Sequence, residues 1–128
     1  MLRPTFLYAA ACLALGTAAA VAARVHDTAV IARSAFFFGG AVLICGCFAL
    51  KNRVHGLAGA AFLSFLYTLT GAGAVIGQLR EGDFHLAAAS TRYLLALFAV
   101  SLVYLLIAVR AFRKARHERL LRELHAED

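Results

Sequence analysis

Three cysteines are the first residues of the sequence with reactive chemistry: Cys12, Cys45 and Cys47. In a helix, the positions of the last two, i and i+2, point in directions about 200° apart. Their thiols therefore cannot close a disulfide or chelate one ion together, and the spacing is not the Cys-x-x-Cys of thiol oxidoreductases. We expect all three side chains to pack as small apolar groups.

Histidines are the second candidates, because imidazole binds haem and zinc. None falls at mid-membrane depth, where a helix bundle would hold haem, and none has the i, i+4 partner of a helical zinc site. His26 beside Asp27, and His85 near Asp83, leave one alternative, a metal site at the membrane surface. We favour no metal site and no cofactor. The five histidines are His26, His55, His85, His117 and His125.

Hydroxyl groups form the third constellation. Ser64, Tyr67 and Thr68 are spaced i, i+3, i+4 and share one helix face, as do Ser101 and Tyr104 further along. Two interpretations stay open: hydrogen bonds between helices, or a narrow polar path for a solute. Proteins that transport ions or protons normally have ionisable residues within the membrane spans, and the central parts of these apolar segments contain none. The sequence has no Walker loop, GxSxG, HExxH or carboxylate pair, so we predict no catalytic residue and no enzyme.

Composition places these groups in a membrane protein. Of 128 residues, 62% are hydrophobic and 16% are charged, with a mean hydropathy of +0.78. Soluble domains have about 45–50% apolar and about 25% charged residues. A disordered chain would need low hydrophobicity and high charge. Both classes are excluded, and the chain is predicted to be an integral membrane protein.

The charges divide the chain into four apolar segments, near residues 5–23, 29–50, 54–79 and 91–109. A helix needs about 20 apolar residues to cross a bilayer core. The segments lack the strict alternation of barrel strands. We predict an all-α fold: a single four-helix transmembrane domain whose last helix continues into a basic tail, 110–128.

Lysine and arginine are distributed unequally between the two sides. Nine of the thirteen fall on one side, which the positive-inside rule assigns to the cytoplasm together with both termini. Arg33, one turn into the second segment, can snorkel outward as an interfacial anchor. The nine are Arg3, Lys51, Arg53, Arg110, Arg113, Lys114, Arg116, Arg119 and Arg122.

The first segment has an alternative interpretation. A basic start followed by an apolar run that ends in Ala20-Val21-Ala22 resembles a cleavable secretory signal. The apolar run is longer than the usual 7–15 residues of such a signal. We expect a retained helix; cleavage would leave three spans.

Small residues predict how the helices associate, because close packing rather than hydrophobic burial holds helices together in lipid. Gly73 and Gly77 form a literal GxxxG on one helix face. Packing within the bundle and a homodimer face are both open interpretations of this motif. The fourth segment has large side chains and no glycine, which suits lipid contact. The predicted packing residues are Gly16, Gly39, Gly59, Gly73 and Gly77.

The tail is the most informative polar segment, because five of the ten residues from 110 to 119 are basic. It contains no helix breaker and is expected to be helical to about His125. Its charges predict contact with lipid headgroups or, with a leucine strip at 120, 121 and 124, a docking surface for a partner. Nucleic-acid binding is not expected. The basic residues are Arg110, Arg113, Lys114, Arg116 and Arg119.

Three short motifs resemble a type of small, uncharacterised four-helix bacterial inner-membrane protein. They are Thr28-Ala29-Val30-Ile31, His55-Gly56-Leu57-Ala58 and Ala111-Phe112-Arg113-Lys114-Ala115-Arg116. The chain departs from the pattern at Ala32, where that type has Pro, and at Ala111, where it has Ser. The resemblance implies the same four-helix topology, a location in a bacterial inner membrane and no particular activity.

Together these patterns favour a non-enzymatic structural or accessory membrane protein that acts through helix packing and a basic cytoplasmic tail. Membrane lipids are the expected partners, with self-association or a larger membrane complex as further options. The alternative is a small oligomeric transporter or channel in which the third helix lines the path.

Overall fold

The computed structural model describes residues 1–23, 28–82, 85 and 87–126, with the backbone alone from 119 onward. The described residues form four helices and no strand, which confirms the predicted all-α fold. All four are long and apolar enough to span a membrane, which identifies an integral membrane protein. The helices are α1 (Leu2–Ala22), α2 (Ala29–Lys51), α3 (Arg53–Glu81) and α4 (Ala89–Ala126).

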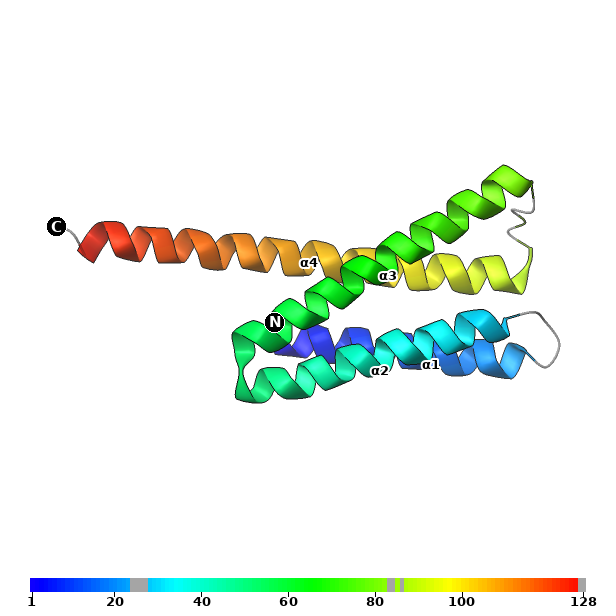
Figure 1. Ribbon diagram of the computed structural model, residues 1–128, viewed down its shortest axis with the longest axis horizontal. Helices are drawn as coiled ribbons and strands as arrows, with labels where there is room; N and C mark the ends of the chain where they lie inside the picture. Colours follow the sequence, from blue (N-terminus) through cyan, green and yellow to red (C-terminus); the bar gives the residue numbers. More distant parts are fainter. Residues whose placement is uncertain (24–27, 83–84, 86, 127–128) are drawn as a thin grey trace.

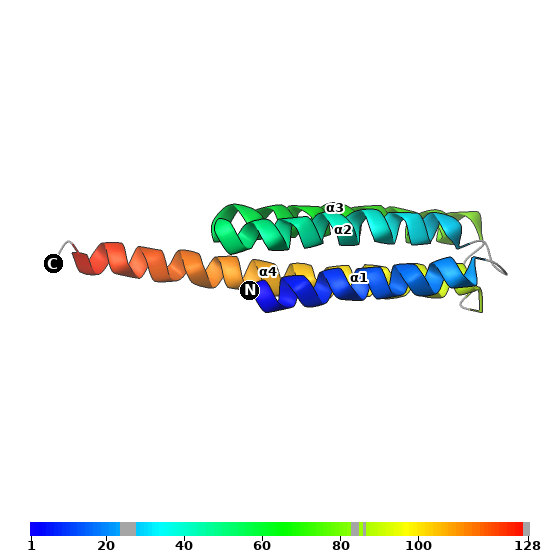
Figure 2. The same cartoon turned by 90° about the horizontal axis from the view of Figure 1, so that it is seen from below.

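The helices run alternately up and down in two layers. Figure 2 shows α2 and α3 in one layer and α1 and α4 in the other. Each helix packs against its neighbour in sequence, and α1 also packs against α4, so the four form a closed ring. We call the end with the start of α1 and the α2–α3 connection the basic end, because Arg3, Lys51 and Arg53 lie there. The other end is the opposite end (Figure 1).

Local sequence explains where the helices stop. Asn52 separates α2 from α3 in an extended conformation, and its side chain accepts a hydrogen bond from the His55 backbone N–H. Gly82 ends α3 with φ of 76°, a left-handed conformation that glycine adopts without strain. The buried Thr28 hydroxyl donates to the Ala19 carbonyl at 2.7 Å, which ties the start of α2 to the end of α1.

Small residues bring α1 and α2 together along their whole length. The buried positions of α2 are alanine, glycine and one valine. A Cβ added at Gly16 would lie 3.1 Å from Ala35 Cβ, and one at Gly39 would lie 3.1 Å from Cys12 Cβ. This is the close backbone approach that helix pairs use in lipid.

The α2–α3 pair is close only near the basic end. There Gly56 lies directly against the backbone of Ala49, and Gly59 packs on Cys45. One layer further, the rings of Phe38 and Tyr67 stack with centroids 4.4 Å apart. These rings hold the helices apart, and Figure 1 shows α3 running obliquely away from α2 toward the opposite end.

The fourth helix is longer than the bundle. It continues past the start of α1 and α3 as one unbroken helix to Ala126 (Figure 1), close to the predicted limit at His125. Its bundle-facing side contains Leu97, Ser101, Tyr104 and Ala108, all nearly or fully buried. The described part of the tail is therefore a direct helical continuation of a membrane-spanning helix.

Candidate functional site

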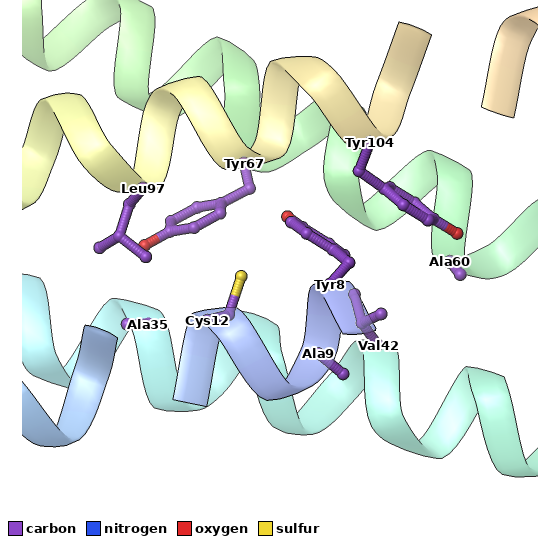
Figure 3. Close-up of a cluster of buried hydrophobic side chains, with 9 residues drawn as sticks. All are labelled: Tyr8, Ala9, Cys12, Ala35, Val42, Ala60, Tyr67, Leu97 and Tyr104. Carbon is purple, nitrogen blue, oxygen red and sulfur yellow. The ribbon is translucent and has the colours of Figure 1, made fainter. Parts of the chain in front are cut away.

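A tyrosine cluster at the α1–α4 interface is the most ordered polar feature of the interior. The rings of Tyr8 and Tyr104 stack with centroids 4.5 Å apart and planes 5° from parallel. The Tyr8 and Ser101 hydroxyl oxygens are 2.9 Å apart, and those of Thr5 and Tyr104 are also 2.9 Å apart. All four residues are buried. Figure 3 shows the two rings side by side with their hydroxyls directed to opposite sides. We call these four residues the tyrosine clasp.

Next to the clasp lie Cys12 and Tyr67. The Cys12 sulfur points toward the interior between Tyr67 and Tyr8 (Figure 3). The Tyr67 hydroxyl is 3.4 Å from the Ser34 hydroxyl, and its ring stacks on Phe38. Among the described residues, the polar groups buried here are hydroxyls and a thiol, and no carboxylate or amine is buried with them.

The three hydroxyl residues predicted on one face of α3 are all buried in the bundle. Ser64 donates to the Ala61 carbonyl at 2.8 Å, and Thr68 donates to the Ser64 carbonyl at 2.8 Å. Only Tyr67 reaches another helix. Across the described side chains, every buried nitrogen or oxygen has a hydrogen-bond partner within the protein. These groups are satisfied by the fold itself.

A lateral cleft of about 230 Å³ lies where α3 diverges from α2. Its walls are mostly apolar, and Ser34, Tyr67 and Thr70 contribute hydroxyls. Gln78 also lines it, with its Oε1 atom 3.4 Å from the Thr91 hydroxyl. Leu97 and Phe98 of α4 complete the lining.

The predicted packing glycines separate into two groups. Gly16, Gly39 and Gly59 contact neighbouring helices. A Cβ added at any of them would lie 3.1 Å from the nearest atom of the adjacent helix. At Gly73 and Gly77, an added Cβ would meet nothing within 4 Å among the described residues. At this level α3 has diverged from α2, so among the described residues this GxxxG contacts no neighbouring helix, and a homodimer face remains the open interpretation.

The described cysteines and histidines form no common site. Cys12 is buried, Cys45 is half-buried and Cys47 is exposed, and all three are free thiols. No group of three metal-ligating side chains occurs among the residues that the structure describes. His26, Asp27 and Asp83 lie outside the described residues.

The basic residues of the tail lie on the free part of α4. Arg110, Arg113, Lys114 and Arg116 are exposed, and the Arg119 side chain lies outside the described part. Lys114 Nζ is 4.0 Å from Glu118 Oε1, an i, i+4 ion pair along the exposed helix.

A second, larger pocket of about 660 Å³ lies at the basic end, in the angle between α4 and the starts of α1 and α3. We call it the basic-end pocket. Arg53 and Arg116 line it from different helices, together with an apolar surface. The complete lining is Met1, Arg53, Val54, Leu57, Ala111, Phe112, Ala115, Arg116 and Glu118.

Sequence reasoning missed half of the clasp and most of this pocket. Thr5 and Tyr8 are three residues apart on an alanine-rich helix, the same spacing as Ser101 and Tyr104 on α4. That matched spacing was a usable signal for two facing polar stripes. No comparable signal joined Arg53 to Arg116.

Comparison with known proteins gave no matching family model, no matching curated protein and no matching solved structure. Function must therefore be inferred from the clasp, the cleft, the basic-end pocket and the charged tail.

Proposed function

We propose that this chain is a non-enzymatic integral membrane protein with a structural or accessory role, built from a self-contained bundle that presents a basic helix at the membrane surface. The observation that supports it is the complete internal pairing of buried side-chain nitrogen and oxygen atoms in the described part. A solute path needs polar groups that are free to bind the passing solute. The central parts of the spans are also without charge.

We further propose that the protein lies in a bacterial inner membrane with its basic end at the cytoplasmic side; the unequal distribution of lysine and arginine supports this orientation. Arg33 is the fifth residue of α2, and its side chain is exposed. In this orientation it lies near the opposite membrane surface and can reach the headgroups. The exposed tail would then lie beside anionic lipids of the inner leaflet.

A structural or accessory role predicts that the protein carries no specific ion or solute across the membrane. Purified protein reconstituted into vesicles is expected to leave the permeability to protons, K⁺, Cl⁻ and small polar solutes at the level of protein-free vesicles. Fluorescent indicators inside the vesicles measure each flux. A solute-selective flux that scales with the amount of protein would contradict the proposal.

The alternative, a small oligomeric transporter, is favoured by one observation: the lateral cleft between α2 and α3 contains hydroxyls in an apolar wall. If a flux exists and uses this cleft, substitutions of the polar α3 residues that line it, Tyr67→Phe, Thr70→Val and Gln78→Leu, should change its rate or selectivity. A flux that all three variants leave unchanged would exclude α3 as the lining of the path.

Self-association is the second part of the accessory role. Gly73 is exposed and Gly77 is half-buried, with open space beside both, so another helix can approach the α3 backbone there. We expect Gly73→Leu to reduce dimerisation in vesicles, measured by energy transfer between labelled copies, and to leave monomer stability unchanged. Gly40→Leu on α2, which also faces open space, is the control. Equal energy transfer in all three proteins would reject this face.

A further inference from the structure

The basic-end pocket continues the bundle-facing side of α4 beyond the bundle. Tyr104 and Ala108 on this side are covered by other helices, with exposed fractions of 3% and 0%. Ala111 and Ala115, one and two turns further, line the pocket instead. The apolar stripe of the membrane helix thus runs past the point where its partner helices begin, and it stays uncovered among the described residues.

Two arginines from separate helices line this pocket. Arg53 is the first residue of α3, and Arg116 is on the free part of α4. Among the described side chains, the one ion pair is Lys114 with Glu118, so neither arginine has a carboxylate within 4.0 Å there. Two guanidinium groups around one pocket repel each other, and an anion held by both removes this repulsion. Arginine binds phosphate oxygens with two parallel hydrogen bonds.

The remaining lining is suited to hydrocarbon. Leu57 is 8% exposed, and Val54 and Phe112 are 57% and 41% exposed. Arginines beside such a surface, at the depth where the α4 span ends, match a ligand with a phosphate group and an acyl chain. Free phosphate would bind the arginines but would leave the apolar surface of the pocket uncovered.

We propose that the basic-end pocket binds one anionic phospholipid of the adjacent leaflet, with its phosphate on Arg53 and Arg116 and its acyl chain along Leu57 and Phe112. The volume of about 660 Å³ lies in the range of ligand pockets, about 300–1,000 Å³. Glu118 also lines the pocket, and Lys114 beside it offsets its charge. The inference rests on the proposed position of the tail at the membrane surface.

Native mass spectrometry of the detergent-solubilised protein tests this site. The protein is titrated with phosphatidylglycerol and, separately, with phosphatidylcholine. We expect one phosphatidylglycerol to bind in clear preference. The double variant Arg53→Gln/Arg116→Gln should bind it at least about 30-fold more weakly, since each lost arginine–phosphate hydrogen bond contributes about 1 kcal/mol and 1.4 kcal/mol corresponds to tenfold.

The matched control is Arg110→Gln/Arg113→Gln, which removes the same charge from α4 outside the pocket. It should retain preferential binding, and circular dichroism should show both variants folded. The proposal is overturned if both double variants weaken binding equally, because a general basic surface would then suffice. It is also overturned if glycerol phosphate displaces the lipid, or if a co-purifying protein subunit occupies the pocket and excludes it. Lipid binding in detergent is independent of the flux measurement, so either proposal can fail alone.

Discussion

Replacing Gly56 with alanine is expected to destabilise the bundle by about 3 kcal/mol, the upper end of the range for overpacking. An added Cβ at this position would lie 2.5 Å from the Cα and Cβ atoms of Ala49, far inside normal contact. Most of the obstacle is backbone, so α2 and α3 must separate rather than rotate a side chain. Unfolding in mixed detergent micelles, followed by circular dichroism, measures the change.

The same substitution at Gly40 is the control, because a Cβ there meets nothing within 4 Å among the described residues. Alanine is favoured over glycine in a helix by about 1 kcal/mol, so Gly40→Ala should be neutral or slightly stabilising. If Gly56→Ala and Gly40→Ala behave alike, the close α2–α3 approach at the basic end is wrong.

These glycines show how far the sequence predicts the fold. Hydropathy and charge were enough to predict four helices, their order and the long last helix, because span length and apolar content are local properties. The partner of each glycine is not local. Gly56 and Gly59 meet α2, Gly71 meets Phe98 of α4, and Gly73 meets nothing described. The oblique course of α3 determines which helix each glycine contacts. A motif along one helix does not specify the angle at which that helix crosses its neighbours.

The polar groups have the same limit. Residues that share a helix face can be identified from their spacing, and the sequence therefore placed Ser101 and Tyr104 on the same face of α4. Their partners, Thr5 and Tyr8, are about 95 residues away and depend on the rotation of α1 about its axis. The basic-end pocket is still harder to predict from sequence, because it forms only where α4 extends beyond the ends of the helices packed against it.

Lipid exposure also explains why a clasp of hydroxyls and stacked rings matters here. Apolar side chains gain little by leaving lipid for the protein interior, so packing and hydrogen bonds must select the correct helix neighbours. The α1–α2 contact uses small residues, whereas α1 meets α4 through two tyrosines. The clasp therefore closes the ring between the first and last helices.

The clasp predicts a large difference between two substitutions at one position. Tyr104→Ala is expected to destabilise the bundle by between about 3 and 4 kcal/mol, because it leaves a cavity worth about 2 kcal/mol, removes a stacked pair worth about 1 kcal/mol and breaks a hydrogen bond. Tyr104→Phe keeps the ring on Tyr8 and loses only the hydroxyl bound to Thr5. It should cost about 0.6 kcal/mol, the average for hydrogen bonds between membrane helices.

Unfolding in mixed micelles measures both variants, and Tyr93→Ala on the same helix is the control, because Tyr93 has no stacking partner among the described residues. Thr5→Val should cost more than Tyr104→Phe, because it also removes the bond that the Thr5 hydroxyl donates to the Met1 carbonyl at 3.0 Å. The double variant should cost little more than Thr5→Val alone, since both substitutions remove the same Thr5–Tyr104 hydrogen bond. Fully additive effects would show that the two hydroxyls act separately. Equal costs for Tyr104→Ala and Tyr104→Phe would show that the hydroxyl, rather than the stacked ring, holds α1 to α4.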